Sequence, residues 1–177
     1  MEFRLILCDL YRAMTDAWAK EFADCSGVET HQGDMMQVAA DAYVSPANSY
    51  GDMGGGLDFV VRERFGRPIE ARVQAAIRAT GGPLPVGQAL VVETQDPHVP
   101  YLIVAPTMRE PTIVAHTRNA YEAMLALLRA AREFNREHPE AITSIAIPGL
   151  GTGVGRMPLD RAAQQMREAY DAFLAEL

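Results

Sequence analysis

The chain contains little cysteine and no grouping of metal ligands. Cys8 and Cys25 are its only cysteines, and their separation fits neither a metal site nor a disulfide framework. The four histidines are scattered along the sequence without ligand spacing. We therefore expect no metal and no other cofactor. Cys8 ends an apolar run and is expected to be a small buried hydrophobic residue.

Long hydrophobic runs are also missing. No apolar stretch in the sequence reaches the roughly 20 residues that a membrane-spanning helix needs. The first residues lack the basic start and apolar centre of a secretory signal peptide. With 177 residues and a hydrophobic fraction of 49%, the chain is long enough for a sizeable core. We expect a single cytoplasmic domain spanning 1–177, with no membrane partner.

Positive charge is scarce, because Lys20 is the only lysine and the formal net charge is −7. A negative field opposes general binding to nucleic acid, so nucleic acid is not expected as a partner. The same field opposes phosphate binding. Any bound phosphate would therefore have to be held mainly by backbone amides.

Three common nucleotide-binding and hydrolase motifs do not occur. Gly-Lys-Ser and Gly-Lys-Thr are both missing, which excludes a P-loop. A dinucleotide-binding fingerprint at 149–155 would need a further strand after its helix, but the chain has room there for one helix only. Ser45 and Ser49 lack the Gly-x-Ser-x-Gly elbow of a serine hydrolase.

Two glycine-rich loops are the most informative feature that is present. The first loop covers 45–58 and the second covers 149–155, and each lies between a short apolar run and a helical pattern. Glycine allows backbone N–H groups to approach a bound anion closely, and a following helix start adds partial positive charge. The loops predict a cleft for a phosphorylated small molecule, with Asn48 and Asp58 as the chemical groups at its edge.

The rest of the sequence alternates between strand and helix patterns. We expect strands at 3–8, 28–31, 41–44, 88–94, 101–105 and 142–147, and helices at 10–23, 57–65, 69–80, 114–137 and 158–177. This alternation predicts an α/β fold in which helices cover both faces of a mixed sheet. Ligands in such folds bind beyond the carboxyl ends of the strands, where both glycine loops are expected.

Four short motifs in this order resemble those of the macro domain, an ADP-ribose-binding module. They are Gly33-Asp34-Met35, Ser45-Pro46-Ala47-Asn48, Gly54-Gly55-Gly56-Leu57-Asp58 and Gly151-Thr152-Gly153-Val154. The resemblance covers most of the chain from about residue 33 onward. It implies a three-layer α/β/α fold with a central mixed sheet.

The resemblance also implies a role for each motif. Asp34 would accept a hydrogen bond from the adenine amino group, with Met35 beside it in the binding site. Asn48 would hold the hydroxyls of the distal ribose, and Asp58 would act on a water near its anomeric carbon, which makes these two the expected catalytic residues. The remaining expected ligand contacts come from the two loops: Gly54, Gly55 and Gly56 in the first, and Gly149, Gly151, Thr152, Gly153, Val154 and Gly155 in the second.

A purely structural role stays open for several of these residues. Asp34 could cap the helical turn that follows it, and Asn48 could bind its own backbone in a turn. Asp58 could simply complement a helix dipole. Asp52 is a second acid in the same loop.

The chain also departs from the family's pattern. Ser45 stands where the family has asparagine, and Gly155 falls where many members have an aromatic residue. Arg109 could reach the cleft and Arg156 could approach a phosphate, but a place on the surface is favoured for both. Taken together, the resemblance implies that the protein binds ADP-ribose and hydrolyses mono-ADP-ribose from a protein carboxylate or a small conjugate. The alternative is a non-catalytic reader of ADP-ribose or an accessory protein.

Overall fold

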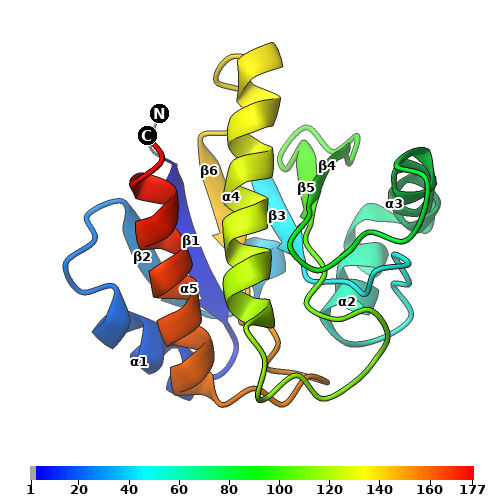
Figure 1. The fold of residues 1–177 in the computed structure, drawn as a ribbon. Helices are drawn as coiled ribbons and strands as arrows, with labels where there is room; N and C mark the ends of the chain where they lie inside the picture. Colours follow the sequence, from blue (N-terminus) through cyan, green and yellow to red (C-terminus); the bar gives the residue numbers. More distant parts are fainter. Residues whose placement is uncertain (1–2) are drawn as a thin grey trace.

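The computed structural model describes residues 3–177 and has the layered arrangement expected from the sequence (Figure 1). Its elements in chain order are β1 (Arg4–Asp9), α1 (Arg12–Glu21), β2 (Val28–Gln32), the 3-10 turn η1 (Met35–Gln37), β3 (Ala42–Ser45), α2 (Gly56–Phe65), α3 (Pro68–Ala79), β4 (Leu90–Glu93), β5 (Tyr101–Val104), α4 (Asn119–Glu137), β6 (Ser144–Ile147) and α5 (Leu159–Leu174). No helix within residues 3–177 combines the length and the apolar character needed to cross a membrane.

The strands form one mixed sheet with the order β2-β1-β6-β3-β5-β4. β1 pairs in parallel with β2 and β6, and β3 pairs in parallel with β6 and β5. β4 runs antiparallel to β5 at one edge. The parallel strands therefore all end at the same side of the sheet, which is where a ligand site is expected.

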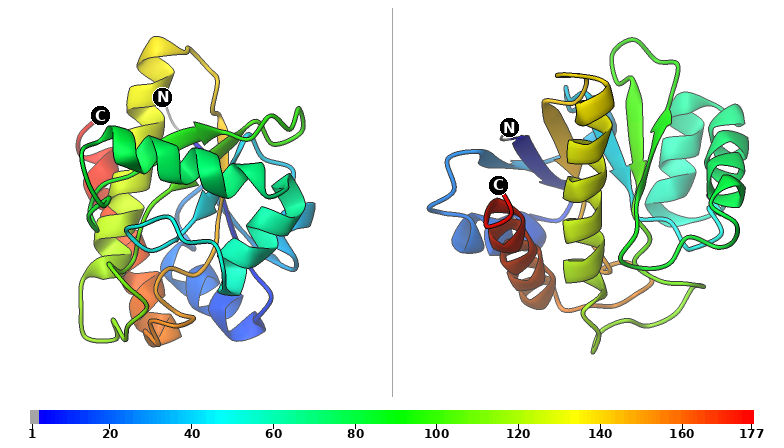
Figure 2. Two further views of the ribbon diagram at one scale, coloured as in Figure 1. Left: turned by 90° about the vertical axis from the view of Figure 1, so that its right-hand side faces the viewer. Right: turned by 45° about the horizontal axis from the view of Figure 1, so that its top comes forward.

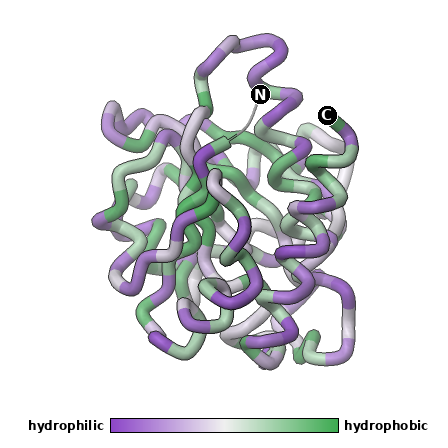
Figure 3. The backbone as a smooth tube through the Cα atoms, turned by 90° about the vertical axis from the view of Figure 1, so that its left-hand side faces the viewer, coloured by the Kyte–Doolittle hydropathy of each residue, from purple (hydrophilic) through white to green (hydrophobic). Residues whose placement is uncertain are grey.

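Helices cover both faces of this sheet, with α4 and α5 on one side and α2 on the other (Figure 2). β1 shows how one strand serves two cores. Leu5 and Leu7 join the core formed with α1, α4 and α5, whereas Ile6 and Cys8 join the core formed with α2 and α3. Hydrophobic segments accordingly run through the centre of the fold (Figure 3). The predicted three-layer α/β/α architecture is confirmed.

One predicted helix begins later than expected. The pattern from residue 114 onward predicts helix, but α4 begins at Asn119. The amide of Val114 donates to the carbonyl of Gly155 across 2.8 Å, and the hydroxyl of Thr117 accepts from the amide of Asn119. The segment before α4 is therefore held by a bond to the second glycine loop and by a local turn, and the regular helix begins only after this turn.

The segment after β1 also differs from the expectation. A first helix beginning at residue 10 would have Asp9 as its cap, but the N-cap of α1 is Tyr11 and its first residue is Arg12. Oδ1 of Asp9 accepts a hydrogen bond from the amide of Tyr11 instead, across 2.9 Å. This short turn leaves Leu10 67% exposed and Tyr11 73% exposed beside the carboxyl end of β1.

Candidate ligand-binding site

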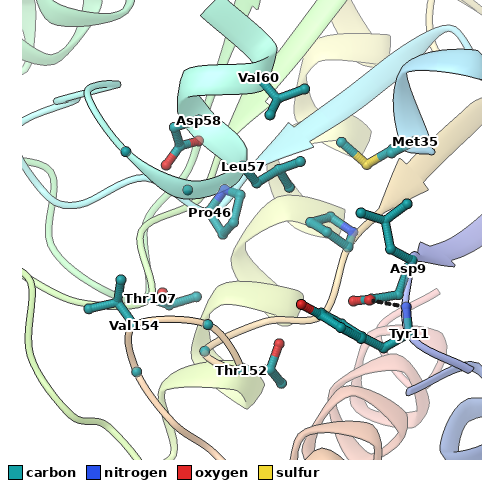
Figure 4. A pocket seen from close by; sticks show the side chains of 18 of the residues that line it. Asp9, Tyr11, Met35, Pro46, Leu57, Asp58, Val60, Thr107, Thr152 and Val154 are labelled. Atoms are coloured by element: carbon teal, nitrogen blue, oxygen red, sulfur yellow. Dashed lines mark hydrogen bonds between the residues drawn. The ribbon is translucent and has the colours of Figure 1, made fainter. Parts of the chain in front are cut away.

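A cavity of about 570 Å³ lies at the carboxyl ends of the parallel strands. The segments after β1, β2, β3, β5 and β6 all contribute to its lining. Figure 4 shows that these segments surround a common space, with Asp9 and Met35 on one side and Asp58 and Val154 on the other. The volume falls in the range of small-molecule sites in proteins.

Most of the residues expected from the sequence line this cavity. They are Asp34, Met35, Asn48, Gly55, Gly56, Asp58, Gly149, Gly151, Thr152, Gly153, Val154 and Gly155. Gly54 does not line it, and its amide donates to Oδ1 of Asp52 across 2.9 Å. Arg109 and Arg156 are exposed and lie outside the lining. The two glycine loops thus meet at one site, although they are about a hundred residues apart in the sequence.

Asn48 combines a turn role with a place in the cavity. Its Oδ1 accepts from the amides of Tyr50 and Asp52, across 3.0 and 3.3 Å. This is the turn geometry that the sequence left open as an alternative. The amide oxygen is therefore occupied by the loop, and the Nδ2 group is the part of the side chain that can donate to a ligand.

Asp34 likewise has a structural bond and a free oxygen. Its Oδ1 accepts from the amide of Met36 across 2.9 Å and so caps η1. Its Oδ2 has no hydrogen bond within residues 3–177 and belongs to an exposed side chain on the cavity wall. Capping and ligand binding are therefore compatible at this residue.

The first loop leads into α2 with open backbone. Gly55 is the N-cap of α2, and Gly56, its first residue, has a φ of +58° that favours glycine. A Cβ added at either position would meet nothing within 4 Å. The first amides of a helix have no partners within the helix, so this turn offers N–H donors beside the cavity.

Asp58 lies in the first turn of α2 and is half-buried. Its Oδ1 accepts a hydrogen bond from Oγ of Ser45 across 2.5 Å. Burial raises the pKa of the Asp58 carboxyl to about 6, the bond from Ser45 opposes the rise, and the negative charge of Asp52 adds to it. A carboxyl with this pKa can exchange a proton near neutral pH, as a general base must.

The second loop presents a row of amide donors. The N–H groups of Thr152, Gly153, Val154 and Gly155 donate no hydrogen bond to any residue within the described part of the chain. These residues all line the cavity. Amides without a protein acceptor along one wall are the donors that the predicted anion site would require.

The glycines of the second loop differ in the reason for their presence. A Cβ on Gly149 would lie 2.6 Å from Oγ1 of Thr152, and one on Gly155 would lie 2.6 Å from the carbonyl oxygen of Gly151. Gly151 has a φ of +73°. Gly153 has open space around it. Three of the glycines therefore shape the loop, and the fourth leaves the approach to it unobstructed.

The charge of the cavity wall is negative. Asp9, Asp34, Asp52 and Asp58 line it, whereas no lysine, arginine or histidine of residues 3–177 does. An anion bound here would therefore be held by amide dipoles without help from a cationic side chain.

Residues 44–166 match the family model described as "Macro domain". The chain belongs to this family. Its members are ADP-ribose-binding domains, as the four motifs predict. The match covers both glycine loops and more than half of the chain.

The chain is also similar to several other proteins. A protein of Aquifex aeolicus is 36% identical over 82% of this chain and 82% of its own length. A macro domain-containing protein of Streptomyces coelicolor is 33% identical over 78% of this chain and 79% of its own. A DNA ADP-ribosyl glycohydrolase of Mycobacterium tuberculosis is 27% identical over 78% of this chain, which corresponds to 37% of that protein.

Solved structures show the same fold. The macrodomain of Mycobacterium tuberculosis DarG matches with a TM-score of 0.67 and 23% identity, over 80% of this chain and 88% of that one. An Oceanobacillus iheyensis macrodomain solved with ADP matches with a TM-score of 0.65 and 23% identity, over 82% and 75% of the two chains.

Part of the cavity wall was not identified from the sequence. Cys8, Asp9, Leu10 and Tyr11 all line it, and they lie outside the residues that match the family model. β1 lies between β2 and β6, whose following segments also line the cavity, so the turn after β1 forms part of the same wall. The only available signal was that this turn follows an apolar strand, which does not reveal the neighbours of that strand.

Proposed function

We propose that the chain forms a single domain over 1–177 that binds ADP-ribose in this cavity and hydrolyses it from a conjugate. The observation that supports the proposal most strongly is the row of amides at Thr152 to Gly155 that have no acceptor among the described residues. Asn48 and Asp58 line the same cavity as these amides. Amides can bind a diphosphate in a cavity that has no cationic lining.

The proposed orientation of the ligand follows from the polar groups. The adenine amino group donates to Asp34, whose Oδ2 is free of protein partners among the described residues. The diphosphate accepts from the amides of the second loop. The distal ribose then lies between Asn48 and the first turn of α2, where Nδ2 of Asn48 donates to a ribose hydroxyl.

The proposed reaction is hydrolysis at the anomeric carbon of the distal ribose. A water attacks this carbon and gives its proton to Asp58, while the bond to the acceptor oxygen breaks. A carboxylate acceptor leaves as an anion and needs no proton. Asn48 and the first loop hold the sugar so that the water is well placed, and Asp58 is the general base.

The preferred acceptor is a protein carboxylate or a small conjugate. The name of the mycobacterial relative points to DNA as another acceptor. The net charge of −7 and the four aspartates of the cavity wall disfavour a polyanion near the site. ADP-ribosylated DNA is therefore included as a substrate in the test and is expected to react more slowly.

A non-catalytic reader of ADP-ribose is the alternative function. The same cavity would bind the ligand, and Asp58 would then only complement the dipole of α2. The bond between Asp34 and η1 and the turn formed by Asn48 suit either function, because neither bond requires a reaction.

Single-turnover release of ADP-ribose tests the proposal. Wild-type protein is mixed in excess with protein mono-ADP-ribosylated on aspartate or glutamate, and in parallel with ADP-ribosylated DNA. We expect release from the protein conjugate, slowed by about two to four orders of magnitude in Asp58→Asn. Asp52→Asn is the matched acid in the same loop and should have a smaller effect. Tight binding of ADP-ribose without release from any conjugate would support the reader function.

A further inference from the structure

The carboxylate of Asp58 is held from behind the cavity. Its one hydrogen bond within residues 3–177 comes from Oγ of Ser45, at 2.5 Å. Ser45 is the last residue of β3, is fully buried, and does not line the cavity. Asp58 does line it. The pair therefore connects the wall of the cavity to the central sheet.

We propose that Ser45 is a positioning residue for Asp58: its hydroxyl fixes Oδ1 and leaves Oδ2 as the oxygen that accepts a proton from water. The proposal rests on the proposed hydrolytic function. It gives Ser45 a role in the reaction without contact to the substrate. Ser45 stands at a position where the family has asparagine.

The place of Ser45 in the fold suits this role. β3 is an interior strand that pairs in parallel with both β5 and β6. The carbonyl of Ser45 accepts from the amide of Ala105 across 3.0 Å, which holds the backbone of the donor in place. Asp58 is carried by a separate element, the first turn of α2. A donor on a rigid strand can therefore fix an acceptor on the helix more precisely than a loop residue could.

The charges around Asp58 make the Ser45 hydroxyl important for the ionisation of the Asp58 carboxyl as well. Burial and the negative charge of Asp52 both raise the pKa of Asp58, whereas the bond from Ser45 lowers it. Arg62, one turn further along α2, is paired with Glu70 of α3 at 3.5 Å. Of these influences on Asp58, only the Ser45 hydroxyl favours the charged carboxylate.

The first test measures the ionisation of Asp58 without reference to activity. The pKa of its side-chain carboxyl is followed by carbon-detected NMR in wild type, Ser45→Ala and Ser45→Thr. We expect the pKa to rise by about one unit in Ser45→Ala, because a hydrogen bond to the charged form is lost, and to return in Ser45→Thr. An unchanged Asp58 pKa in folded Ser45→Ala would overturn the proposal. If Ser45→Ala does not fold, Ser45→Cys, a weaker donor, should give a smaller rise, and no rise would again overturn it.

The second test separates positioning from simple structural support. Ser45→Ala should lower the single-turnover rate about tenfold or more and move the acidic limb of the pH–rate profile upward by the same one unit. The dissociation constant for ADP-ribose should stay within about twofold of wild type. Equal rates and pH profiles in the two proteins would contradict the role of Ser45. If wild type hydrolyses no conjugate while the pKa response is intact, it is the proposed function that fails.

Discussion

Gly151 and Gly155 lie backbone to backbone in the second glycine loop. A Cβ added to Gly155 would lie 2.6 Å from the carbonyl oxygen of Gly151 and 2.5 Å from Cγ2 of Val114. The residue at 155 is therefore fixed by packing, and no aromatic side chain fits there. This close approach brings the intervening residues, Thr152 to Val154, to the wall of the cavity.

The two kinds of glycine in this loop predict opposite outcomes for a matched pair of variants. Gly153 has open space and no positive φ, so Gly153→Val should fold with a near wild-type melting temperature. Its side chain should obstruct the amides and weaken ADP-ribose binding about tenfold or more. Gly155→Ala should lower the free energy of unfolding by about 1–3 kcal/mol, because the methyl group has no room.

Thermal denaturation and calorimetry with ADP-ribose measure both effects. Unchanged affinity in folded Gly153→Val would show that the loop is only a turn. A fully stable Gly155→Ala would contradict the close packing of Gly155 against Gly151 and Val114.

The absence of cations from the described lining predicts an unusual response to salt. Binding of a phosphate by lysine or arginine weakens as ionic strength rises. In the proposed binding mode, the net charge of −7 and the four aspartates of the cavity wall repel the ligand, and only amides hold its phosphates. We expect the ADP-ribose affinity to be constant or slightly higher when salt is raised from about 0.05 to 0.5 M. A steep fall in affinity over this range would indicate a cationic ligand group instead.

The ionisation of Asp58 predicts a stabilising variant. Its folded pKa is about 6, above the ordinary value of 3.8, so the unfolded chain loses this proton at lower pH than the folded protein does. Stability is therefore lost as the pH rises through this window. We expect Asp58→Asn to raise the free energy of unfolding by about 1–3 kcal/mol at neutral pH and to have little effect near pH 4.

Urea denaturation at several pH values measures this difference. A residue that only complemented the dipole of α2 would give the opposite sign, with a loss of about 0.3–1 kcal/mol in the variant. If Asp58 is the general base, the wild-type hydrolysis rate should rise through about pH 6.

Asp41 provides a stability prediction at the opposite end of the sheet. Its Oδ2 accepts from the amides and hydroxyls of Thr143 and Ser144, at 2.8 to 3.0 Å. Although burial alone would raise the pKa of Asp41, these bonds lower it. The contribution to stability is therefore present above the ordinary pKa of aspartate and is lost as the pH falls through the lowered one.

We expect Asp41→Ala to lower the free energy of unfolding by about 2 kcal/mol at neutral pH, because bonds to a charged acceptor are lost. The effect should shrink in acid. The ADP-ribose affinity should not change, because the cavity lies at the other ends of these strands. A loss of affinity that exceeds the loss of stability would show that the two ends of the sheet are coupled.

The sequence was sufficient for the features that depend on local pattern. The alternation of strands and helices predicted the layers. The helix predicted at 57–65 ends at Phe65 as α2 does, and Gly66 follows it with a φ of +86°. The glycine loops were informative because glycine spacing reports directly on backbone geometry. Family motifs then added the order in which the loops occur.

Features that depend on long-range contacts could not be predicted in the same way. The pairing of β1 between β2 and β6 brings Tyr11 to the cavity, and no local pattern encodes strand order. The bond from Ser45 to Asp58 depends on how the first turn of α2 packs against the end of β3, which no local pattern encodes. The start of α4 was misplaced because residues 114–118 form a turn that is bonded to Gly155, and the helical periodicity does not reveal this contact.

Calorimetric titration of the wild-type protein with ADP-ribose, ADP and AMP tests the central claim most directly. The diphosphate is expected on the amides of the second loop, and the distal ribose at Asn48 and the first turn of α2. ADP-ribose should therefore bind more tightly than ADP, and ADP more tightly than AMP, with the advantage of ADP-ribose reduced in Asn48→Ala. Equal affinities for ADP-ribose and ADP would contradict a distal-ribose site, and no binding of either would contradict the assignment of the cavity.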